Sequence, residues 1–499
     1  MSKADVKING KTYSVEIGTK LKDILHISIP CGGHGRCGKC KVYAEGKISQ
    51  PSIAEKSNLT PEEIQKGIRL ACMTYVEGNC SVKVLTKETE NKILTKVNIR
   101  TNVKTPLFSK YGLAVDIGTT TIAANLFDIS GNIVCSDSKM NPQSHWGADV
   151  ISRIEASMKG SKSELAEAVC NTLDEMISDI AKKADINTAD IDGLVITGNT
   201  AMLHLLTKTD VEPLSKAPFK AKRLFNEYIK AEELNLKTLL PQTQIYLPPC
   251  ISAFIGADTV CAMTASSIGN GNKTEVLADI GTNGEMVLSH NGKLYACSTA
   301  AGPAFEGAGI SMGMNGKTGA IDKVKIYGGE MFTHVIGEGS PVGICGSGLV
   351  DAIACLLELE ILDETGYLED DEIEILNPVK ITRNDIRKIQ TAKSAIISGI
   401  KTMVKVMDIG NDKISKLIIA GGFGNYLNPG NAGKIGLLPK EMISKIEIAG
   451  NAALSGASMI LLNSEYKEKA EILAKSTEVL PLDSNPIFTE EYIENMYFL

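Results

Sequence analysis

Short runs of alternating apolar and polar residues begin the chain. VKI and YSVEI flank Asn9-Gly10, a spacing typical of two strands joined by a tight hairpin turn. TKLKDILHI (19–27) then has helical spacing, and Thr19 is placed to cap that helix. The same reasoning predicts strands in KVYAEG, RLACMTYV and CSVKVL and a short helix that starts at Pro61 behind Thr60. The pattern up to about residue 86 therefore indicates a small, strand-rich domain.

From Tyr111 onwards the chain alternates strands and helices and repeats itself once. Residues 111–134 and 274–295 each give an apolar strand, the letters D-I-G-T, a second strand, a glycine turn and a third strand. Later in each half an apolar strand enters a glycine turn and a helix, at 193–206 and 416–427. One unit that recurs once after 163 residues predicts two similar lobes rather than a solenoid. The polar segment before it, 87–110, lacks periodicity and is expected to be a linker or an irregular strap.

The composition is that of an ordinary globular protein. Of 499 residues, 43% are hydrophobic and 22% are charged, and the net charge of −7 argues against a general nucleic-acid binder. No run of 18 apolar residues predicts a membrane span, and the first residues do not resemble a secretory signal. Twelve cysteines in such a chain are expected to stay reduced. The sequence thus predicts a cytoplasmic protein that binds neither nucleic acid nor membrane.

Four cysteines have a spacing that suits a metal centre. Cys31, Cys37 and Cys40 lie within ten residues in a glycine-rich loop, and Cys72 follows after a gap of 31 residues. Four thiolates can hold a 2Fe–2S cluster, and a glycine-rich loop lets backbone N–H groups face its sulfurs. A zinc site is the main alternative, although zinc ribbons usually pair two C-x2-C knuckles. Four unrelated buried cysteines are the other alternative.

These segments resemble the 2Fe–2S ferredoxins of the β-grasp fold. CGGHGRCGKC is similar to the cluster loop of that family, and GIRLACM is similar to its distal cysteine segment. The resemblance implies that Cys31, Cys37, Cys40 and Cys72 are the ligands of a 2Fe–2S cluster. Cys80 falls outside the motif and is expected to be a packed core thiol.

The two D-I-G-T turns suit phosphate binding. Asp116 and Asp279 each end an apolar strand, and the glycine two residues later permits a turn whose N–H groups face phosphate oxygens. The threonine hydroxyls add donors, whereas an aspartate beside phosphate has to act through Mg²⁺ or water. A single D-x-G turn is an ordinary hairpin turn, but two at matching places, with Ala-Gly-Gly-Phe-Gly at 420–424, favour a polyphosphate site.

This motif set resembles the superfamily of acetate and sugar kinases, heat-shock ATPases and actin. The resemblance implies two RNase H-like lobes with ATP in the cleft, Asp116 as a carboxylate on the Mg²⁺ side and Asp279 as the group that orients the attacking water. Glu285 either shares that role or is solvated. The implied nucleotide contacts are Gly118, Thr119 and Thr120 in the first turn, Gly281, Thr282 and Asn283 in the second, and Gly421, Gly422 and Phe423 in the adenosine motif.

Three further segments carry weaker signals. Residues 384–404 predict a helix capped by Asn384 or Thr382, and the resemblance makes Gln390 and Lys393 candidates for contact with the base and ribose, the alternative being a solvated helix face. The glycine-rich segment 297–321, whose one carboxylate before Asp322 is Glu306, is either a connector or a lining of the cleft. Gly346-Ser347-Gly348 enters a helix whose N-terminus either faces phosphate or ribose or packs within its lobe.

The predicted fold is α/β: a β-grasp 2Fe–2S ferredoxin domain followed by a two-lobed, duplicated RNase H-like ATPase. The predicted bounds are 1–86 for the ferredoxin-like domain, 87–110 for the linker, and 111–270 and 271–499 for the two lobes. Residues 1–86 carry 13 Lys and Arg and 8 Asp and Glu, a net +5, which leaves −12 for the rest. A basic domain favours docking of an acidic electron donor, and an ordinary solvated surface is the alternative.

Taken together, the chain resembles a short member of the ATP-dependent reductive activators of corrinoid proteins. The segments that carry this resemblance are ITGNTAMLHLL, PPCISAFIGAD, DIGTNGEM, AGPAFEGAGISMGM and GGFGNYLN. It implies reduction of Co(II) to Co(I) in the corrinoid protein of a methyltransferase system, coupled to ATP hydrolysis. It also implies a low-potential electron donor such as a ferredoxin or flavodoxin, and it is compatible with a homodimer. Two alternatives stay open: an ATP-dependent activator of another metalloenzyme, such as a radical dehydratase, and a redox-sensing ATPase regulator.

Overall fold

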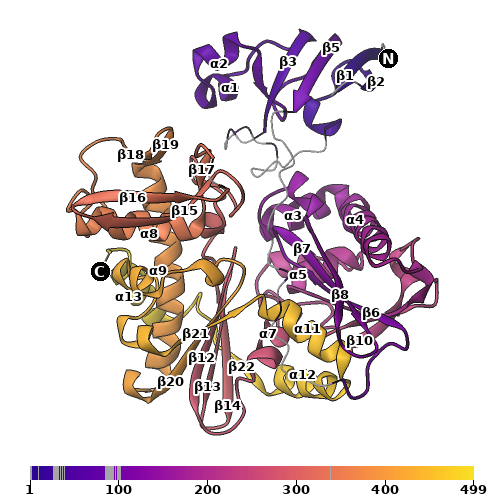
Figure 1. Cartoon of the computed structure of the whole chain (residues 1–499), viewed down its shortest axis with the longest axis vertical. Coiled ribbons are helices and arrows are strands. Elements are labelled where there is room, and N and C mark those ends of the chain that lie inside the picture. The colour runs from indigo at the N-terminus through magenta and orange to yellow at the C-terminus, as the bar shows by residue number, and fades with distance from the viewer. Residues whose placement is uncertain are drawn as a thin grey trace. The chain divides into compact units, whose positions relative to one another are not determined.

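The structure is a computed structural model that describes residues 3–8, 11–25, 33, 35, 38, 40–84, 95, 97, 103–337 and 339–498. The chain forms two compact units (Figure 1). The first unit comprises residues 1–90 and 142–161, and the second comprises 91–141 and 162–499.

The first unit contains a mixed five-stranded sheet in the order β2-β1-β5-β3-β4. Strands β1 and β5, the first and last along the chain, lie side by side and run parallel, and the other neighbouring strands are antiparallel. The strands are β1 (Lys3–Ile8), β2 (Lys11–Glu16), β3 (Lys41–Ile48), β4 (Ile68–Leu70) and β5 (Val76–Val84). Two short helices, α1 (Ile53–Asn58) and α2 (Pro61–Gln65), begin with capping boxes at Ser52 and Thr60, so the predicted helix at Pro61 is confirmed.

The helix predicted for residues 19–27 is wrong over the part that the structure describes. Only one 3-10 turn forms, η1 (Leu21–Asp23), and Thr19 Oγ1 donates to the carbonyl of Glu16 rather than capping a helix. The backbone N–H groups of Leu21 and Lys22 donate to the segment that follows β4, so tertiary partners replace the helical ones. Residues 26 and 27, like the predicted Asn9-Gly10 turn, lie outside the described residues. The same unit holds α3 (Val150–Ala156), capped by Asp149.

The second unit is built on two six-stranded sheets that share the topology of five strands. In each, an antiparallel three-strand meander is extended by two strands that run parallel to its first strand, which is the RNase H-like order. The sixth strands differ, because β10 pairs antiparallel with β11 at one edge of the first sheet, whereas β22 pairs parallel with β14 at the opposite edge of the second. The first sheet has the order β10-β11-β9-β6-β7-β8, with β6 (Tyr111–Ile117), β7 (Thr121–Asp128), β8 (Ile133–Met140), β9 (Ile191–Gly198), β10 (Glu227–Lys230) and β11 (Gln244–Leu247). The second has the order β21-β20-β12-β13-β14-β22, with β12 (Thr274–Ile280), β13 (Gly284–His290), β14 (Lys293–Thr299), β20 (Ile414–Ala420), β21 (Ile446–Gly450) and β22 (Thr477–Val479). The duplication predicted from the sequence is confirmed.

The strand registers show which positions in the two sheets correspond. Asp116 pairs with Ala123 on β7, and Asp279 pairs with Glu285 on β13. The two aspartates therefore end equivalent first strands, whereas the neighbouring position is an alanine in one lobe and a glutamate in the other. The duplicated scaffold thus presents two aspartates symmetrically and a third carboxylate on one side alone.

Helix α7 (Ala257–Ser266) connects the two sheets in sequence and in space. One set of its side chains, including Val260, belongs to the apolar cluster of the first sheet, and another, including Met263, to that of the second. Helices α11 (Ala452–Leu462) and α12 (Glu465–Ser476) follow the second sheet in sequence, yet Figure 1 shows them, in yellow, beside the first sheet. The lobes are thus tied together by a segment that crosses back, and the predicted division at residues 270 and 271 stays a prediction.

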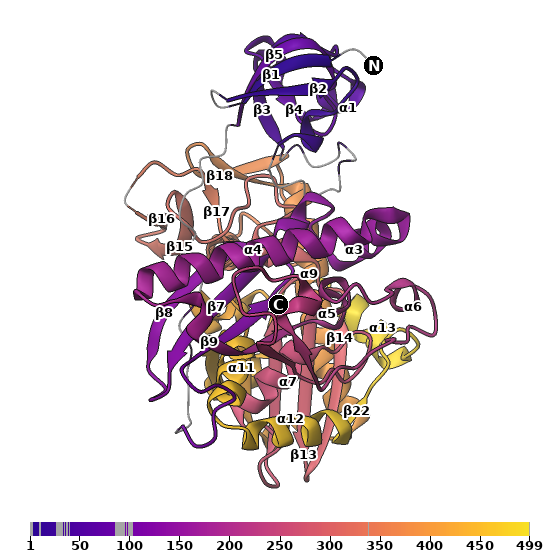
Figure 2. The same cartoon turned by 90° about the vertical axis from the view of Figure 1, so that its right-hand side faces the viewer.

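The remaining elements are helices and the strands of two smaller sheets, β16-β15-β17 and β18-β19. In Figure 2 the long helix α4 crosses the strands β7, β8 and β9. The other helices are α4 (Lys162–Ala184), α5 (Thr200–Leu206), α6 (Glu212–Ser215), α8 (Gly346–Glu358), α9 (Arg383–Val406), α10 (Pro429–Lys434) and α13 (Pro486–Glu494). The remaining strands are β15 (Ala320–Tyr327), β16 (Glu330–Val335), β17 (Gly343–Ile344), β18 (Glu372–Leu376) and β19 (Val379–Thr382). Within the described ranges, no helix is both long and apolar enough to cross a membrane.

Candidate functional site

A cavity of about 300 Å³ lies in the second unit, where the first strands of both sheets end. It collects both D-I-G-T turns and the glycine loop after β20, although these segments are far apart in the chain. The sequence-predicted residues that line it are Asp116, Gly118, Thr119, Thr120, Asp279, Gly281, Thr282, Asn283, Gly421, Gly422 and Phe423. Glu285, whose role the sequence left open, lines it as well.

Two asparagines that sequence reasoning missed hold the first turn in shape. Asn141, at the end of β8, donates from Nδ2 to the carbonyl of Gly118 at 2.8 Å, and its backbone N–H donates to the carbonyl of Thr120. Asn199 caps α5 and donates from Nδ2 to Thr119 Oγ1 at 3.2 Å. Asn199 directly follows a predicted strand, whereas Asn141 lies beyond the strand predicted to end at residue 134 and had no such signal. These contacts fix the turn before any ligand arrives.

Within the described part of the chain, five carboxylates line the cavity, and four of them, Asp116, Asp258, Asp279 and Glu285, have a raised pKa. Burial, together with the charge of Asp258, raises the pKa of both Asp116 and Asp279 to about 7. Burial likewise raises the pKa of Asp258 to about 6, and burial with the charges of Asp258 and Asp279 raises the pKa of Glu285 well above its usual value. Asp258, in the first turn of α7, was missed because it follows no D-I-G-T motif. Such a concentration of negative charge favours a cationic partner.

The fit to a divalent cation is indirect. Among the residues that the structure describes, no three His, Cys, Asp or Glu side chains converge closely enough to ligate a metal by themselves. Carboxylate oxygens suit Mg²⁺, which usually keeps several waters and takes only one or two carboxylates. Asp116 has one fixed partner, Asn451 Nδ2, which donates to its Oδ2 at 3.2 Å from the N-cap of α11.

The glycine loop after β20 approaches the second aspartate closely. Gly421 has φ of +93°, and a Cβ at this position would lie 2.7 Å from Asp279 Oδ1. Beyond it, the ring of Phe423 stacks on that of Phe305 with centroids 5.1 Å apart, and both residues line the cavity. Ser347, in the first turn of α8, also lines the cavity, so the interpretation that this helix start faces the cleft is supported.

Two predicted adenosine contacts, Gln390 and Lys393, do not line the cavity. Both are on α9, which forms as predicted behind Thr382, but both side chains are buried. Lys393 Nζ donates to the carbonyls of Asn495 and Tyr497, the former at 2.7 Å, and burial lowers its pKa to about 7. Gln390 Nε2 donates to the carbonyl of Thr365 at 3.0 Å.

The geometry therefore corrects both interpretations of this helix face. The side chains of Gln390 and Lys393 are neither solvated nor directed into the cavity, because they hold the 363–367 turn and the C-terminal segment. A polar side chain off the apolar stripe is equally compatible with solvent, ligand or buried carbonyl partners, and only the tertiary structure distinguishes them.

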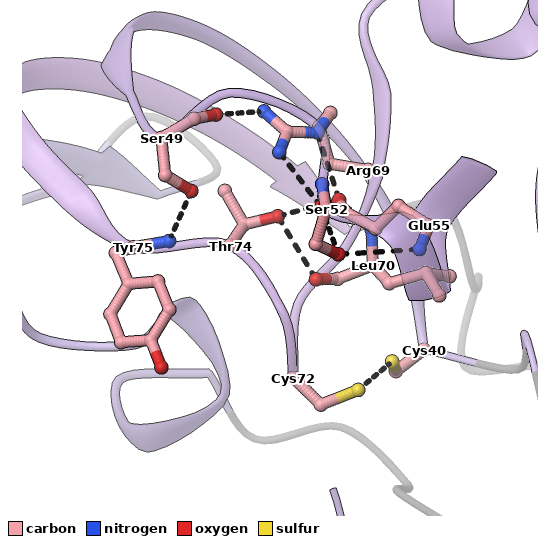
Figure 3. A network of polar contacts seen from close by, with 9 residues as sticks. All are labelled: Cys40, Ser49, Ser52, Glu55, Arg69, Leu70, Cys72, Thr74 and Tyr75. Atoms are coloured by element: carbon pink, nitrogen blue, oxygen red, sulfur yellow. Dashed lines mark hydrogen bonds and ion pairs between the residues drawn. The ribbon is translucent and has the colours of Figure 1, made fainter. Parts of the chain in front are cut away.

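In the first unit, two of the four predicted cluster ligands lie together. Cys40, just before β3, and Cys72, just after β4, are buried with their sulfurs 3.3 Å apart (Figure 3). This separation exceeds the ~2.05 Å of a disulfide and suits two thiolates that share one metal atom. Cys31 and Cys37 lie outside the described residues. The described half of the site thus fits an iron–sulfur cluster.

A buried ion pair supports the segment that carries Cys72. Glu55, fully buried on α1, accepts hydrogen bonds from Arg69 Nε at 2.9 Å, from Leu70 N at 3.1 Å and from Thr74 Oγ1 at 3.0 Å (Figure 3). Burial opposes ionisation of Glu55, but the hydrogen bonds from Arg69 and from backbone N–H groups outweigh it and lower the pKa of Glu55. Residues on both sides of Cys72 are therefore held to one carboxylate, which sequence reasoning did not single out.

Three parts of the chain match described families. Residues 6–77 match a 2Fe-2S iron-sulfur cluster binding domain, residues 111–270 match the RACo middle region, and residues 273–499 match the C-terminal domain of RACo, the ASKHA domain. The predicted fold class is confirmed by these matches together with the topology of the sheets.

Similar proteins agree with this assignment. The corrinoid activation enzyme RamQ of Eubacterium limosum is 35% identical over 78% of this chain and 70% of its own length. The [Co(II) methylated amine-specific corrinoid protein] reductase of Methanosarcina barkeri is 26% identical over 78% of this chain and 76% of its own. A solved reductive activator for corrinoid, iron-sulfur protein is 28% identical with a TM-score of 0.73, covering 99% of this chain and 98% of that one. The chain therefore belongs to the RACo family.

Proposed function

We propose that this chain is an ATP-dependent reductive activator of a corrinoid protein. It would accept one electron from a low-potential donor and pass it to cobalt, so that Co(II) becomes Co(I). The observation that carries the proposal is the presence, in one chain, of paired cysteines suited to a cluster and a cavity where two phosphate-type turns meet. Relatives named as corrinoid activation enzyme and corrinoid protein reductase support the choice of acceptor.

The need for ATP follows from the chemistry of the acceptor. Co(II)/Co(I) couples lie at very low potential, and for one electron about 59 mV corresponds to a tenfold change in the equilibrium constant. A gap of about 200 mV thus demands about 5 kcal/mol, which a ferredoxin-type centre alone does not provide. A chain that binds the corrinoid protein better in one nucleotide state can supply that energy by favouring a cobalt geometry that is easier to reduce.

The proposed roles in the cavity follow from its donors and charges. The hydroxyls of Thr119, Thr120 and Thr282 and the N–H groups of both turns would bind the phosphates of ATP. Asp116 would hold Mg²⁺ through water on the side of the first turn. Asp279, with its raised pKa, would orient and deprotonate the attacking water during hydrolysis. Gly421 and Phe423 would face the nucleoside.

In the first unit the four cysteines would hold the cluster, which supplies one-electron transfer when bound. Cys40 and Cys72 are the pair placed to share one iron atom. The basic character of residues 1–86 favours an acidic donor, such as a ferredoxin or flavodoxin. A homodimer is compatible with this function and stays a prediction.

The test uses the full chain with its cluster, a low-potential chemical reductant and a Co(II) corrinoid protein, with Co(I) followed by its absorbance. We expect Co(I) to form with Mg-ATP and not with ADP, and the ATPase rate to rise when the corrinoid protein is added. Cys72→Ala should abolish Co(I) formation and keep ATPase activity, whereas Asp279→Asn should abolish both ATPase activity and Co(I) formation and keep the cluster spectrum. Asp370→Asn, at an exposed position, is the matched control.

Two outcomes would contradict the proposal. Equal Co(I) formation with and without ATP would show that hydrolysis and electron transfer are not coupled. A chain whose ATPase rate follows the oxidation state of its cluster, but which reduces no corrinoid protein, would instead be a redox-sensing regulator.

A further inference from the structure

Glu306 joins the two phosphate-type turns to each other. Thr282 Oγ1, in the second turn, donates to Glu306 Oε1 at 3.0 Å, and Thr120 Oγ1, in the first turn, donates to Glu306 Oε2. The two carboxylate oxygens of Glu306 thus accept hydrogen bonds from turns of different lobes. Glu306 is the last residue of the 3-10 turn η6 (Pro303–Glu306) and belongs to neither of the motifs that it connects.

The carboxylate lies where the proposed function places a phosphate group. It lines the cavity, and a Cβ added to Gly281 would lie 3.4 Å from Glu306 Oε1, so the carboxylate sits directly over the second turn. It accepts hydrogen bonds from the same hydroxyls that a phosphate between the turns would use. In the chain without nucleotide, the carboxylate of Glu306 therefore accepts the hydrogen bonds that a phosphate group would accept.

We propose that Glu306 is a positioning residue that latches the two turns together until the terminal phosphate of ATP displaces it. The inference rests on the proposed function, because it requires ATP to bind between the turns. Each threonine hydroxyl has a single proton to donate, and two anions cannot occupy one space, so phosphate and carboxylate exclude each other.

The position of η6 links this exchange to the rest of the site. Phe305 precedes Glu306 and stacks on Phe423, in the loop that the proposed function assigns to the nucleoside. Release of Glu306 by phosphate therefore acts on a segment that also contacts the loop after β20. The arrival of a terminal phosphate, rather than of a nucleoside alone, would be the event that frees this segment.

The test compares nucleotide binding by the full chain and by Glu306→Ala and Glu306→Gln variants, measured by calorimetry with Mg²⁺. Because ATP no longer competes with the carboxylate, Glu306→Ala should bind ATP about tenfold more tightly, ADP should gain less, and AMP should be unchanged. Glu306→Gln should fall between, since its amide offers a single acceptor oxygen. Glu330→Ala, at an exposed position on β16, should bind all three nucleotides as the unaltered chain does.

A second measurement needs no variant. Addition of Mg-ATP to the unaltered chain should speed backbone hydrogen exchange in residues 303–309, and addition of AMP should not. The latch is overturned if this exchange ignores ATP, if Glu306→Ala binds ATP no more tightly, or if ATP and AMP gain equally. Absence of ATP binding by both the unaltered chain and Glu306→Ala would instead overturn the proposed function.

Discussion

At the scale of single residues, the cavity concentrates carboxylates that oppose folding. Burial raises the pKa of Asp116, Asp258 and Asp279 from 3.8 to about 6 or 7, and the charge of Asp258 contributes to the values of the other two. The folded chain thus binds more protons than the unfolded chain between about pH 4 and pH 7. The three protonated carboxyl groups favour the folded chain fully below about pH 4. This stabilisation is lost as the pH rises towards 7 and the buried groups ionise.

Asp258→Asn should therefore raise the free energy of unfolding above pH 7. For a pKa of about 6, the gain is about 1–3 kcal/mol, since one pKa unit corresponds to 1.36 kcal/mol. Calorimetric melting of the nucleotide-free chain at pH 5 and pH 8 measures it, and the gain should be larger at pH 8. Asp370→Asn, exposed on the surface, should change neither melt. A loss of stability in Asp258→Asn at pH 8 would contradict this account of the cluster.

At the scale of elements, the segment 70–74 depends on a carboxylate from a different element, α1. Breaking a buried ion pair by removing one partner costs about 3–5 kcal/mol, because the other charge is left unpaired. Glu55→Gln should therefore destabilise the first unit by about that amount and speed loss of the cluster absorbance in the presence of a chelator. Glu62→Gln, exposed on α2, is the matched control.

The double variant Glu55→Met with Arg69→Met distinguishes the cost of an unpaired buried charge from the loss of the ion pair itself. Replacing both charges by apolar side chains removes the unpaired group, so this variant should recover part of the lost stability. If cluster loss is equally fast in Glu55→Gln and in Glu62→Gln, the network of Figure 3 does not support Cys72.

The loop after β20 gives a second prediction at this scale. Gly421→Ala introduces a Cβ at φ of +93° and within 2.7 Å of Asp279 Oδ1, whereas Gly271→Ala introduces one at φ of +92° with no atom within 4 Å. Both variants bear the left-handed cost of about 1 kcal/mol, so their difference isolates the contact. We expect Gly421→Ala to lose most ATPase activity and Gly271→Ala to keep it. Equal activities would show that the loop does not need this close approach.

At the scale of the whole molecule, the uneven charge predicts how electrons enter. Residues 1–86 carry a net +5 within a chain of net −7, so an acidic donor would be attracted to the first unit. Raising the salt from about 50 to 300 mM shortens the screening length and should slow cluster reduction by an acidic ferredoxin several-fold. Reduction by photoreduced deazaflavin, a small neutral radical, should stay constant. A salt-independent rate with the ferredoxin would favour an ordinary solvated surface.

The sequence by itself determined the elements whose signals are local. The D-I-G-T turns, the capped helices at Thr60 and Thr382 and the repeated strand order are written in neighbouring residues, because turns, caps and periodicity need only local partners. The four-cysteine spacing likewise needed no tertiary information. These features were enough to predict two lobes, a phosphate-type cavity and a cluster domain.

Only the tertiary structure decided which distant side chains meet. Glu306 lies far in sequence from Thr120, Asp258 from Asp116, and Glu55 from Arg69, and no motif marks these pairs. The same long-range packing gave Lys393 backbone carbonyls instead of a nucleotide, and it left a single 3-10 turn in residues 19–25, the described part of the expected helix. Local pattern fixes what a segment can form, whereas the energy of burying a polar or charged group depends on partners that folding brings from elsewhere in the chain.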